Sequence, residues 1–471
     1  MASAATRRTP EAPSLRLWNL VVPKGQVGTE ILAGFTTFMV MAYIIFVNPS
    51  ILGFSGDASL AGKGLPFAAT LTSTCLVAGV MTILMGLYTN RAFALAPGMG
   101  LNAVVAYQLV VTDGLSWPAA MGVIFLEGVI ITILVLTGLR EAIMRAVPVQ
   151  LKKAISVGIG LFIMFIGLNE AGIVVKGVGT PLTLGTLTGA PVFVAIVGIA
   201  LTLILHVRKV KGALLISIVA TTVIAVILNS LYGGKAFASG AVVPSGIVDL
   251  PDFSLLGKFD PIGVFVKLPI FVAVMTIFSI MLSDFFDTVG TLVGVGSQAG
   301  YLDEKGQFKD VFKPLLVDSL AAVAGGAASS SSCTTYIESQ AGVQAGGRTG
   351  LTSIVVGLLF LVSMFLAPIA GIVPAQATAG ALIAVGIMMI GVLVNKDEPL
   401  DLTDPETAWP IVTTFIMMPL TYSITNGIGA GFVVYTLIRL VSGKRDSAML
   451  YVASAAFLLY FLQSALIPLF G

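Results

Sequence analysis

The sequence predicts an all-α polytopic membrane protein with about 14 transmembrane segments in a 7+7 inverted repeat that contains two broken spans. The first observation is composition: 57% of the 471 residues are hydrophobic and 10% are charged, whereas soluble domains carry about 25% charged residues. The second is a series of long apolar runs. The third is that glycine, proline or serine interrupts one run at a matching place in each half.

The apolar runs define the predicted spans, because a membrane-crossing helix needs about 20 apolar residues. In the first half they cover 29–51, 66–89, 92–112, 117–138, 147–168, 191–207 and 212–232; in the second they cover 264–297, 311–327, 328–346, 349–372, 374–394 and 408–441, with a last run at 448–470. Residues 408–441 are either one long span or a hairpin with its tip at Asn426–Gly427. The sequence leaves both readings open, and with them whether 448–470 crosses the membrane.

Basic residues predict the orientation of the chain, since Lys and Arg favour cytoplasmic loops. One side collects Arg7, Arg8, Arg16, Lys24, Arg140, Arg145, Lys152, Lys153, Arg208, Lys209, Lys211, Lys305, Lys309, Lys313 and Arg348. The opposite loops hold isolated lysines, such as Lys176. Residues 1–28 have no apolar core and no cleavage site, so they are predicted to be a cytoplasmic tail rather than a signal peptide. The expected location is the cell inner (plasma) membrane.

An internal sequence repeat supports the division of the chain into two related halves. The segments Val147–Gln150 (VPVQ) and Val373–Gln376 (VPAQ) each open a span, and Gly160 and Gly386 follow them at the same distance. The interrupted spans are also third in each half. Because seven spans is an odd number, the two halves have opposite orientations in the bilayer, as in an inverted repeat.

The two interrupted spans are the predicted centre of function. Non-helical backbone at membrane depth requires protein or a water-filled cavity around it. We expect Ala328–Ser332 to be extended and to lead into a half-helix that carries Glu338, and Ala92–Ala96 to be extended before a helix that Pro97 starts. Paired broken spans in corresponding halves point to the binding site of a transporter.

Five carboxylates at predicted membrane depth are candidate functional groups, because a charge there costs about 2.5–3.5 kcal/mol or more. They must be protonated, bind a cation or face water. Asp284 and Asp287 share a helix face with Thr288, and Asn102 follows the Pro-Gly turn. The five acids are Glu127, Asp284, Asp287, Asp318 and Glu338.

Several longer motifs resemble one family. They are AGFTTFMVMAYIIFVNP (33–49), ALAPGMGLNAVVAY (94–107), SDFFDTVGTLVGVGSQAG (283–300), TTYIESQAGVQAGGRTG (334–350) and MMPLTYSITNGI (417–428). The chain is similar from Gly28 to about Ser442 to the nucleobase–cation symporter-2 superfamily, specifically to its AzgA-like adenine/guanine/hypoxanthine permeases.

The resemblance implies two domains with different functions. A core domain (29–138 and 263–372) would hold the substrate, and a gate domain (139–232 and 373–471) would carry a homodimer contact; 233–262 would be an extracellular loop. The family's substrate-site acids correspond to Asp284 and Glu338, supported by Asp287 and Asn102. The backbone at Phe93, Ala94 and Ile337 would offer N–H groups, with the Phe93 ring covering a purine face. Import with a proton is expected, carried by Glu338, Asp284, Asp318 or Glu127, and sodium is the less expected ion.

Two other readings stay open. One is an anion carrier of the same architecture, for sulfate or bicarbonate, although carboxylates do not suit an anion site. The other is an intramembrane aspartyl enzyme, although the paired aspartates share one helix. Neither a cofactor nor a metal is predicted, and the net charge of +2 without a basic stripe does not suggest nucleic acid as a partner.

Overall fold

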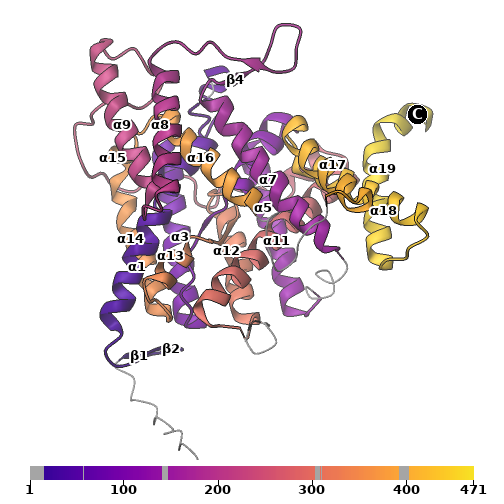
Figure 1. Cartoon of the computed structure of the whole chain (residues 1–471), viewed down its shortest axis with the longest axis horizontal. Helices are drawn as coiled ribbons and strands as arrows, with labels where there is room; N and C mark the ends of the chain where they lie inside the picture. The colour runs from indigo at the N-terminus through magenta and orange to yellow at the C-terminus, as the bar shows by residue number, and fades with distance from the viewer. Residues whose placement is uncertain are drawn as a thin grey trace, which may run out of the picture.

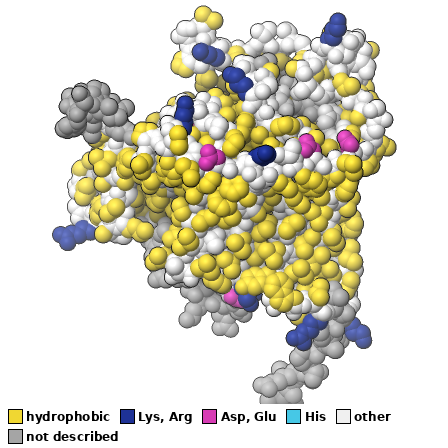
Figure 2. Space-filling view, turned by 180° about the vertical axis from the view of Figure 1, so that it is seen from behind, with side chains coloured by type: hydrophobic (Ala, Val, Ile, Leu, Met, Phe, Trp, Pro, Cys, Tyr) yellow, Lys and Arg dark blue, Asp and Glu magenta, His cyan; other side chains and the backbone are white. Residues whose placement is uncertain are grey.

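The computed structural model describes residues 15–56, 58–139, 147–302, 308, 310–391 and 402–470. Nine helical stretches within these ranges are long and apolar enough to cross a membrane. Figure 2 shows a broad hydrophobic band across one face of the molecule, with most charged side chains near its upper and lower edges. The all-helical polytopic class is therefore confirmed. Six of the basic residues used for orientation lie outside the described ranges: Arg7, Arg8, Arg140, Arg145, Lys305 and Lys309.

The first half of the chain forms the predicted spans in order. Its elements are α1 (Val27–Met41), α2 (Ile44–Leu52), α3 (Phe67–Thr89), β3 (Leu95–Pro97), α4 (Met99–Ala103), the π-helix η2 (Val104–Thr112), α5 (Trp117–Leu136), α7 (Val149–Glu170), α8 (Ala190–Val207) and α9 (Ala213–Leu231). Two small hairpins pair outside the spans: β1 (Leu15–Leu17) with β2 (Leu20–Val22), and β4 (Val174–Val175) with β5 (Thr183–Leu184).

The second half repeats this order. Its elements are α10 (Gly263–Lys267), α11 (Ile270–Ala299), α12 (Phe312–Ala327), β6 (Cys333–Thr335), α13 (Ser339–Gln344), α14 (Gly350–Ser363), the short η3 (Met364–Leu366), α15 (Ala367–Ala370), α16 (Ala375–Ile390), α17 (Pro405–Thr421), α18 (Ile424–Val441) and α19 (Ala448–Phe470). The broken span again comes third.

The helices pack into two groups, each built from both halves. In the first helix group (α1–α5, η2, α10–α15, β3 and β6), α14 packs on α3 and α1, and α12 packs on α5. In the second helix group (α7–α9 and α16–α18), α16 packs on α7 and α8, and α17 packs on α7 and α18. Figure 1 shows α7 and α16 near the middle of the molecule, with α8 and α9 on one side and α17 and α18 on the other.

The repeat glycines explain the contact between α7 and α16. A Cβ added to Gly160 would lie 2.7 Å from the carbonyl oxygen of Gly386, and a Cβ added to Gly386 would meet the carbonyl oxygen of Gly160. Two helix backbones approach this closely only where both residues lack a side chain. The sequence match between Val147–Gln150 and Val373–Gln376 therefore has a physical counterpart, because Pro148 and Pro374 are the N-caps of these two helices.

Residues 408–441 form two helices, so the reading as one long span is wrong. The break is at Tyr422, whose φ of 50° is left-handed, and at Ser423, whose hydroxyl accepts a hydrogen bond from the N–H of Asn426. The predicted tip at Asn426–Gly427 is also wrong, since both residues lie inside α18. Gly427 instead allows α18 to pack closely on α17, because a Cβ added there would meet Met418.

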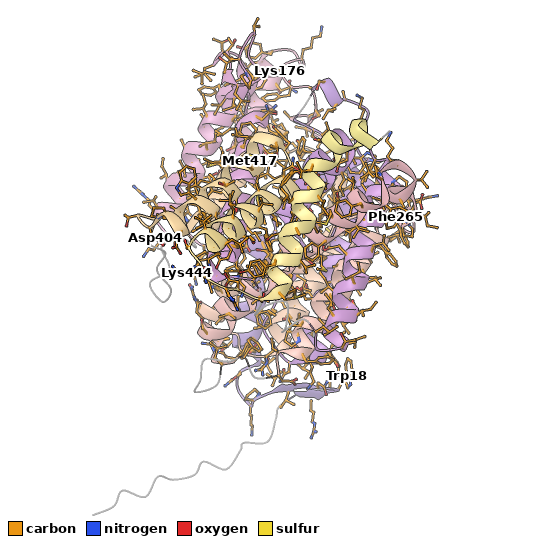
Figure 3. The ribbon with its side chains drawn as sticks, turned by 90° about the vertical axis from the view of Figure 1, so that its right-hand side faces the viewer. Trp18, Lys176, Phe265, Asp404, Met417 and Lys444 are labelled. Atoms are coloured by element: carbon orange, nitrogen blue, oxygen red, sulfur yellow. The ribbon has the colours of Figure 1, made fainter. Side chains whose placement is uncertain are left out.

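Three other spans contain breaks that the sequence did not reveal. The run 29–51 is divided between Met41 and Ile44, 264–297 is divided at Leu268–Pro269, and 349–372 passes through the short η3 before α15. The ends of the molecule agree with the predicted sides: Figure 3 shows Trp18 and Lys176 at opposite ends. Which end faces the cytoplasm stays a prediction.

Candidate functional site

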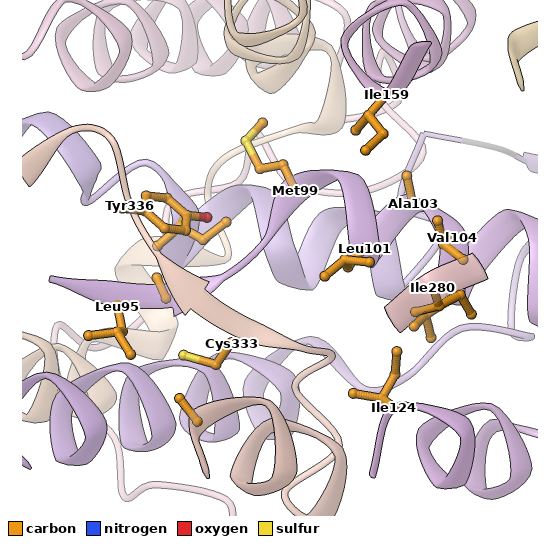
Figure 4. Packing of buried hydrophobic residues seen from close by; sticks show 14 of the residues in the cluster. Leu95, Met99, Leu101, Ala103, Val104, Ile124, Ile159, Ile280, Cys333 and Tyr336 are labelled. Atoms are coloured by element: carbon orange, nitrogen blue, oxygen red, sulfur yellow. The ribbon is translucent and has the colours of Figure 1, made fainter. Parts of the chain in front are cut away.

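The two broken spans meet as a short antiparallel pair. Leu95 pairs with Thr335, Ala96 with Thr334 and Pro97 with Cys333. The pairing extends past both strands, because Gly98 N–H donates to the Ser332 carbonyl at 2.9 Å and Tyr336 N–H donates to the Ala94 carbonyl at 2.9 Å. The predicted meeting of the two interrupted segments is confirmed. Figure 4 shows the pair with Leu95 and Cys333 on one side and Met99 and Tyr336 on the other.

The backbone groups on the outer edge of β3 form hydrogen bonds with a neighbouring helix. The Leu95 N–H donates to the hydroxyl of Thr82 in α3 at 2.9 Å, and that hydroxyl contacts the Leu95 carbonyl at 3.1 Å. An unpaired backbone group at membrane depth would cost several kcal/mol. The strands therefore persist because α3 and the partner strand together satisfy their polar groups.

The extended pieces lie a few residues from their predicted positions. Ala328–Ser332 was expected to be extended but forms a turn, in which Ser329 N–H and Ser330 N–H donate to the carbonyls of Gly326 and Gly325 and so cap the end of α12. Helix ends need such partners for their last carbonyls. On the other side, Pro97 lies in β3 and the helix begins at Met99. Proline is tolerated there because the strand has only one strand partner.

Asp318 of α12 anchors β6. Its carboxylate accepts hydrogen bonds from Thr335 N–H at 2.7 Å, Thr335 Oγ1 at 2.7 Å, Thr288 Oγ1 at 2.6 Å and, more weakly, Thr334 Oγ1 at 3.4 Å. The side chain is 2% exposed. A buried carboxylate that receives this many donors holds them in fixed positions. Asp318 thus fixes the position of β6 through these hydrogen bonds.

A cavity lies beside the strand pair, between the two helix groups. Its polar wall comes from α11 and the β6–α13 segment, its backbone wall from the start of α4, and its apolar wall from α7 and α16 of the second helix group. The lining residues are Tyr43, Gly98, Met99, Gly100, Leu101, Ile159, Ile163, Ser283, Asp287, Thr291, Thr335, Tyr336, Ile337, Glu338, Val385 and Met389.

Glu338 is the acid at the centre of this wall. It is the N-cap residue of α13, so the half-helix starts just after it. Its Oε1 accepts a hydrogen bond of 2.6 Å from the hydroxyl of Tyr43, which sits at the break between α1 and α2. Tyr336 donates its hydroxyl to the Pro97 carbonyl and so ties its ring to the other broken span. One oxygen of Glu338 is thus held by Tyr43.

Of the residues predicted for the site, Asp287, Ile337 and Glu338 line the cavity. Asp284 is buried on α11 behind them. Thr288 faces Asp318 rather than Asp284, as the 2.6 Å hydrogen bond shows. Asp287 and Glu338 therefore line the cavity, whereas Thr288 and Asp318 contact each other and β6.

Asn102 and Glu127 are both buried. Neither amide atom of Asn102 has a hydrogen-bond partner among the described residues. Both oxygens of Glu127 also lack a partner of normal hydrogen-bond geometry in the described part of the chain. Neither residue is part of the cavity lining.

Phe93 and Ala94 were predicted to contact the ligand, and the geometry argues against both. The Phe93 ring is fully buried and packs on the rings of Tyr301 and Phe308, at centroid distances of 5.8 and 6.0 Å. The Ala94 N–H is already used, since it donates to Ser339 Oγ at 3.0 Å. Both residues precede β3 in the chain.

The sequence analysis did not identify Tyr43, Met99 or Tyr336, nor the four apolar residues that the second helix group contributes: Ile159, Ile163, Val385 and Met389. A signal existed for the tyrosines, because a buried tyrosine hydroxyl requires a polar partner. None existed for the apolar residues, which look like any other packing residue in a membrane helix.

An all-helical membrane protein with two broken spans that meet around carboxylates has the architecture of a secondary transporter. The sequence profile of a permease family, Xan_ur_permease, matches residues 28–429. The chain belongs to this family, which confirms the resemblance to AzgA-like permeases. It is a transporter, so the reading as an intramembrane enzyme is wrong.

Relatives with assigned names cover almost the whole chain. The chain is 42% identical over 418 residues to "Adenine permease AdeP" of Escherichia coli (strain K12), covering 88% of each sequence. It is 37% identical to "Guanine/hypoxanthine permease PbuO" of Bacillus subtilis (strain 168), covering 95% of this chain and 99% of that protein.

Solved structures support the fold. The transmembrane domain of the cyanobacterial bicarbonate transporter BicA aligns with a TM-score of 0.60 at 16% identity, covering 86% of this chain and 97% of that domain. SLC26A9 aligns with a TM-score of 0.61 at 12% identity, covering 88% of this chain and 66% of that chain. The chain therefore shares the fold of these 7+7 inverted-repeat transporters.

Proposed function

We propose that this permease imports purine nucleobases, namely adenine, guanine or hypoxanthine, across the plasma membrane by symport with a proton. The cavity beside the strand pair carries this proposal, because it joins a carboxylate wall to an apolar wall. The names of the relatives at 42% and 37% identity support the substrate class.

The chemistry of the cavity suits a planar heterocycle. A purine edge presents N–H groups and ring nitrogens, which the carboxyl groups of Glu338 and Asp287 and the hydroxyls of Ser283 and Thr291 match in hydrogen bonds. Its two faces are apolar and fit between Met99 on one broken span and the isoleucines of α7. Asp284 and Asn102 act from behind the lining as supporting groups.

The transport step is a movement of the two helix groups against each other. The first helix group corresponds to the core domain (29–138 and 263–372), which carries the strand pair and the acids. The second corresponds to the gate domain (139–232 and 373–471), which supplies the apolar wall and a homodimer contact. The amino terminus lies in the cytoplasm.

The coupling proton is carried by an acid whose carboxylate can be protonated without breaking the hydrogen bonds it accepts. Glu338 and Glu127 meet this condition better than Asp318, whose oxygens already accept four hydrogen bonds. Protonation of Asp318 would break at least one of the bonds that position β6. Glu338 is the preferred carrier, since it also lines the cavity.

The alternative of an anion carrier rests on the fold alone, which BicA and SLC26A9 share at 16% and 12% identity. An anion site needs positive potential, whereas the lining residues include two carboxylates and no Lys or Arg. The acids therefore favour an uncharged heterocycle over sulfate or bicarbonate.

The proposal is tested by uptake of labelled hypoxanthine into cells or vesicles that contain the protein. Unlabelled adenine, guanine and hypoxanthine should compete, and uracil should not. Uptake should be faster when the outside pH is lower than the inside pH and should not require sodium. Uptake that sulfate or bicarbonate inhibits, with no effect of purines, would contradict the proposal.

Replacing Tyr43 by phenylalanine should raise the KM for purine about tenfold, because a hydrogen bond to a charged group contributes about 1.5–3 kcal/mol. The ring and its packing are kept, so the maximal rate and membrane abundance should change little. Tyr232→Phe is the matched control, since that tyrosine is 62% exposed. An unchanged KM in Tyr43→Phe would show that the hydroxyl does not position Glu338.

A further inference from the structure

Gln108 joins the two helix groups by its side chain. It lies in the π-helix η2, directly after the half-helix of the first broken span. Its Nε2 donates to the hydroxyl of Thr425 at 2.9 Å, and its Oε1 accepts from the N–H of Ile424 at 2.9 Å. The side chain is 1% exposed, so water does not compete for these hydrogen bonds.

The partner of Gln108 is the break between α17 and α18. The chain turns at Tyr422 in the left-handed conformation, and α18 starts at Ile424. The first N–H groups of a helix have no partner within the helix. Ser423 satisfies the N–H of Asn426, and Gln108 satisfies the N–H of Ile424 from the other helix group. Gln108 is therefore a helix cap supplied across the interface.

The neighbouring residue adds a contact of the same kind. Tyr107 of η2 donates its hydroxyl to Glu170 Oε1 at the end of α7, at 3.2 Å, and its ring lies 6.0 Å from that of Tyr422. The groups also meet through apolar side chains, as where Gly100 lies against Ile159 and Ile163. Apolar contacts are non-directional and tolerate sliding. A hydrogen bond, by contrast, is lost when the donor and acceptor move apart by about 1 Å, or when the donor–hydrogen–acceptor angle falls below about 120°.

We infer that Gln108 is a latch between the two helix groups, which holds the conformation seen here and must open in each transport cycle. This inference rests on the proposed movement of the groups. While the latch is closed, η2 is fixed to α18, and η2 continues the helix whose first turn lines the cavity. Opening leaves the Ile424 N–H and the Gln108 carboxamide without their buried partners, so the closed conformation is favoured until substrate binding offsets this cost.

The latch is tested first by closing it permanently. Gln108→Cys and Thr425→Cys are combined in one chain, and a short, cleavable bifunctional thiol reagent bridges them in vesicles. Bridging should abolish purine uptake, and cleavage of the reagent should restore it. Each single-cysteine variant treated in the same way is the control, which also covers the native, buried Cys75 and Cys333. Full uptake by the bridged protein would overturn the inference.

A second measurement does not depend on the substrate. Gln108→Leu should speed hydrogen exchange of the backbone at Ile424 and Thr425 by about tenfold, because it removes two buried hydrogen bonds. Thr425→Val should have a smaller effect in the same direction. Thr421→Val is the matched control, since the Thr421 hydroxyl bonds only to its own helix, at the Met417 carbonyl. Unchanged exchange in Gln108→Leu would also overturn the latch. Absence of purine uptake by the unmodified protein would instead contradict the proposed function, and the exchange result would still decide the latch.

Discussion

Replacing Glu338 by alanine should abolish purine uptake, with a fall of about 100-fold or more, since up to two hydrogen bonds of about 1.5–3 kcal/mol each are lost. Glu338 is one of the two acids that line the cavity, and its carboxylate accepts a hydrogen bond of 2.6 Å from Tyr43. Its removal takes away the proposed hydrogen-bond partner of the substrate and the proposed proton carrier together. Initial uptake rates, normalised to the amount of protein in the membrane, measure the effect.

Glu338→Gln separates these two roles. Glutamine keeps the size and the hydrogen-bonding oxygen, but it cannot carry a proton. It should bind purine more weakly than the wild type and show no stimulation by an inward proton gradient. Glu406→Gln is the control, because Glu406 contacts Lys444 at the partly exposed end of α17, away from the cavity, and such exposed pairs contribute little. Gradient-driven uptake by Glu338→Gln equal to wild type would reject Glu338 as the proton carrier.

Replacing Asp318 by alanine should destabilise the protein more than any other exchange of a membrane acid. It removes the acceptor of the Thr335 N–H and of the Thr288 and Thr335 hydroxyls, and leaves them buried without partners. The expected loss is about 3 kcal/mol or more in free energy of unfolding, together with loss of uptake. Thermal denaturation in detergent, followed by gel filtration, measures the stability.

Glu127 offers a matched comparison on the adjoining helix. It is as deeply buried as Asp318, but its carboxylate has no hydrogen-bond partner among the described residues. Glu127→Gln should therefore leave the midpoint of denaturation nearly unchanged, whereas Asp318→Asn should lower it. Equal destabilisation by the two amide variants would show that Asp318 does not anchor β6 through its hydrogen bonds.

The sequence allowed the architecture to be predicted because membrane burial leaves strong local signals. Apolar runs locate the helices, and serines, glycines and Pro97 mark the two segments that cannot be continuous helices. The meeting of those segments also followed, since unpaired backbone at membrane depth needs a partner. Gly160 and Gly386 were predicted as equivalent positions, and they lie against each other between α7 and α16.

The remaining errors have a common physical origin. The extended segment shifted from Ala328–Ser332 to Cys333–Thr335 because Ser329 and Ser330 cap the end of α12, and the contacts with β3 and Asp318 that hold the strand begin only after them. Phe93 was placed in the site because an aromatic ring near a broken span suits a purine, yet its ring packs between other aromatic residues. Tyr43 and Gln108 were missed because the value of a buried polar side chain depends on which distant residue it meets, and no local pattern records that.

The pairing of β3 with β6 has a consequence for biosynthesis. The ribosome completes β3 long before β6, so β3 must enter the translocation machinery before its partner strand exists. During that interval, Thr82 can satisfy only the outer edge of the strand, and the inner edge must stay hydrated or shielded by other cellular factors. The cavity beside the strand pair is therefore expected to form late, and a chain truncated before Cys333 should insert its helices without forming that cavity.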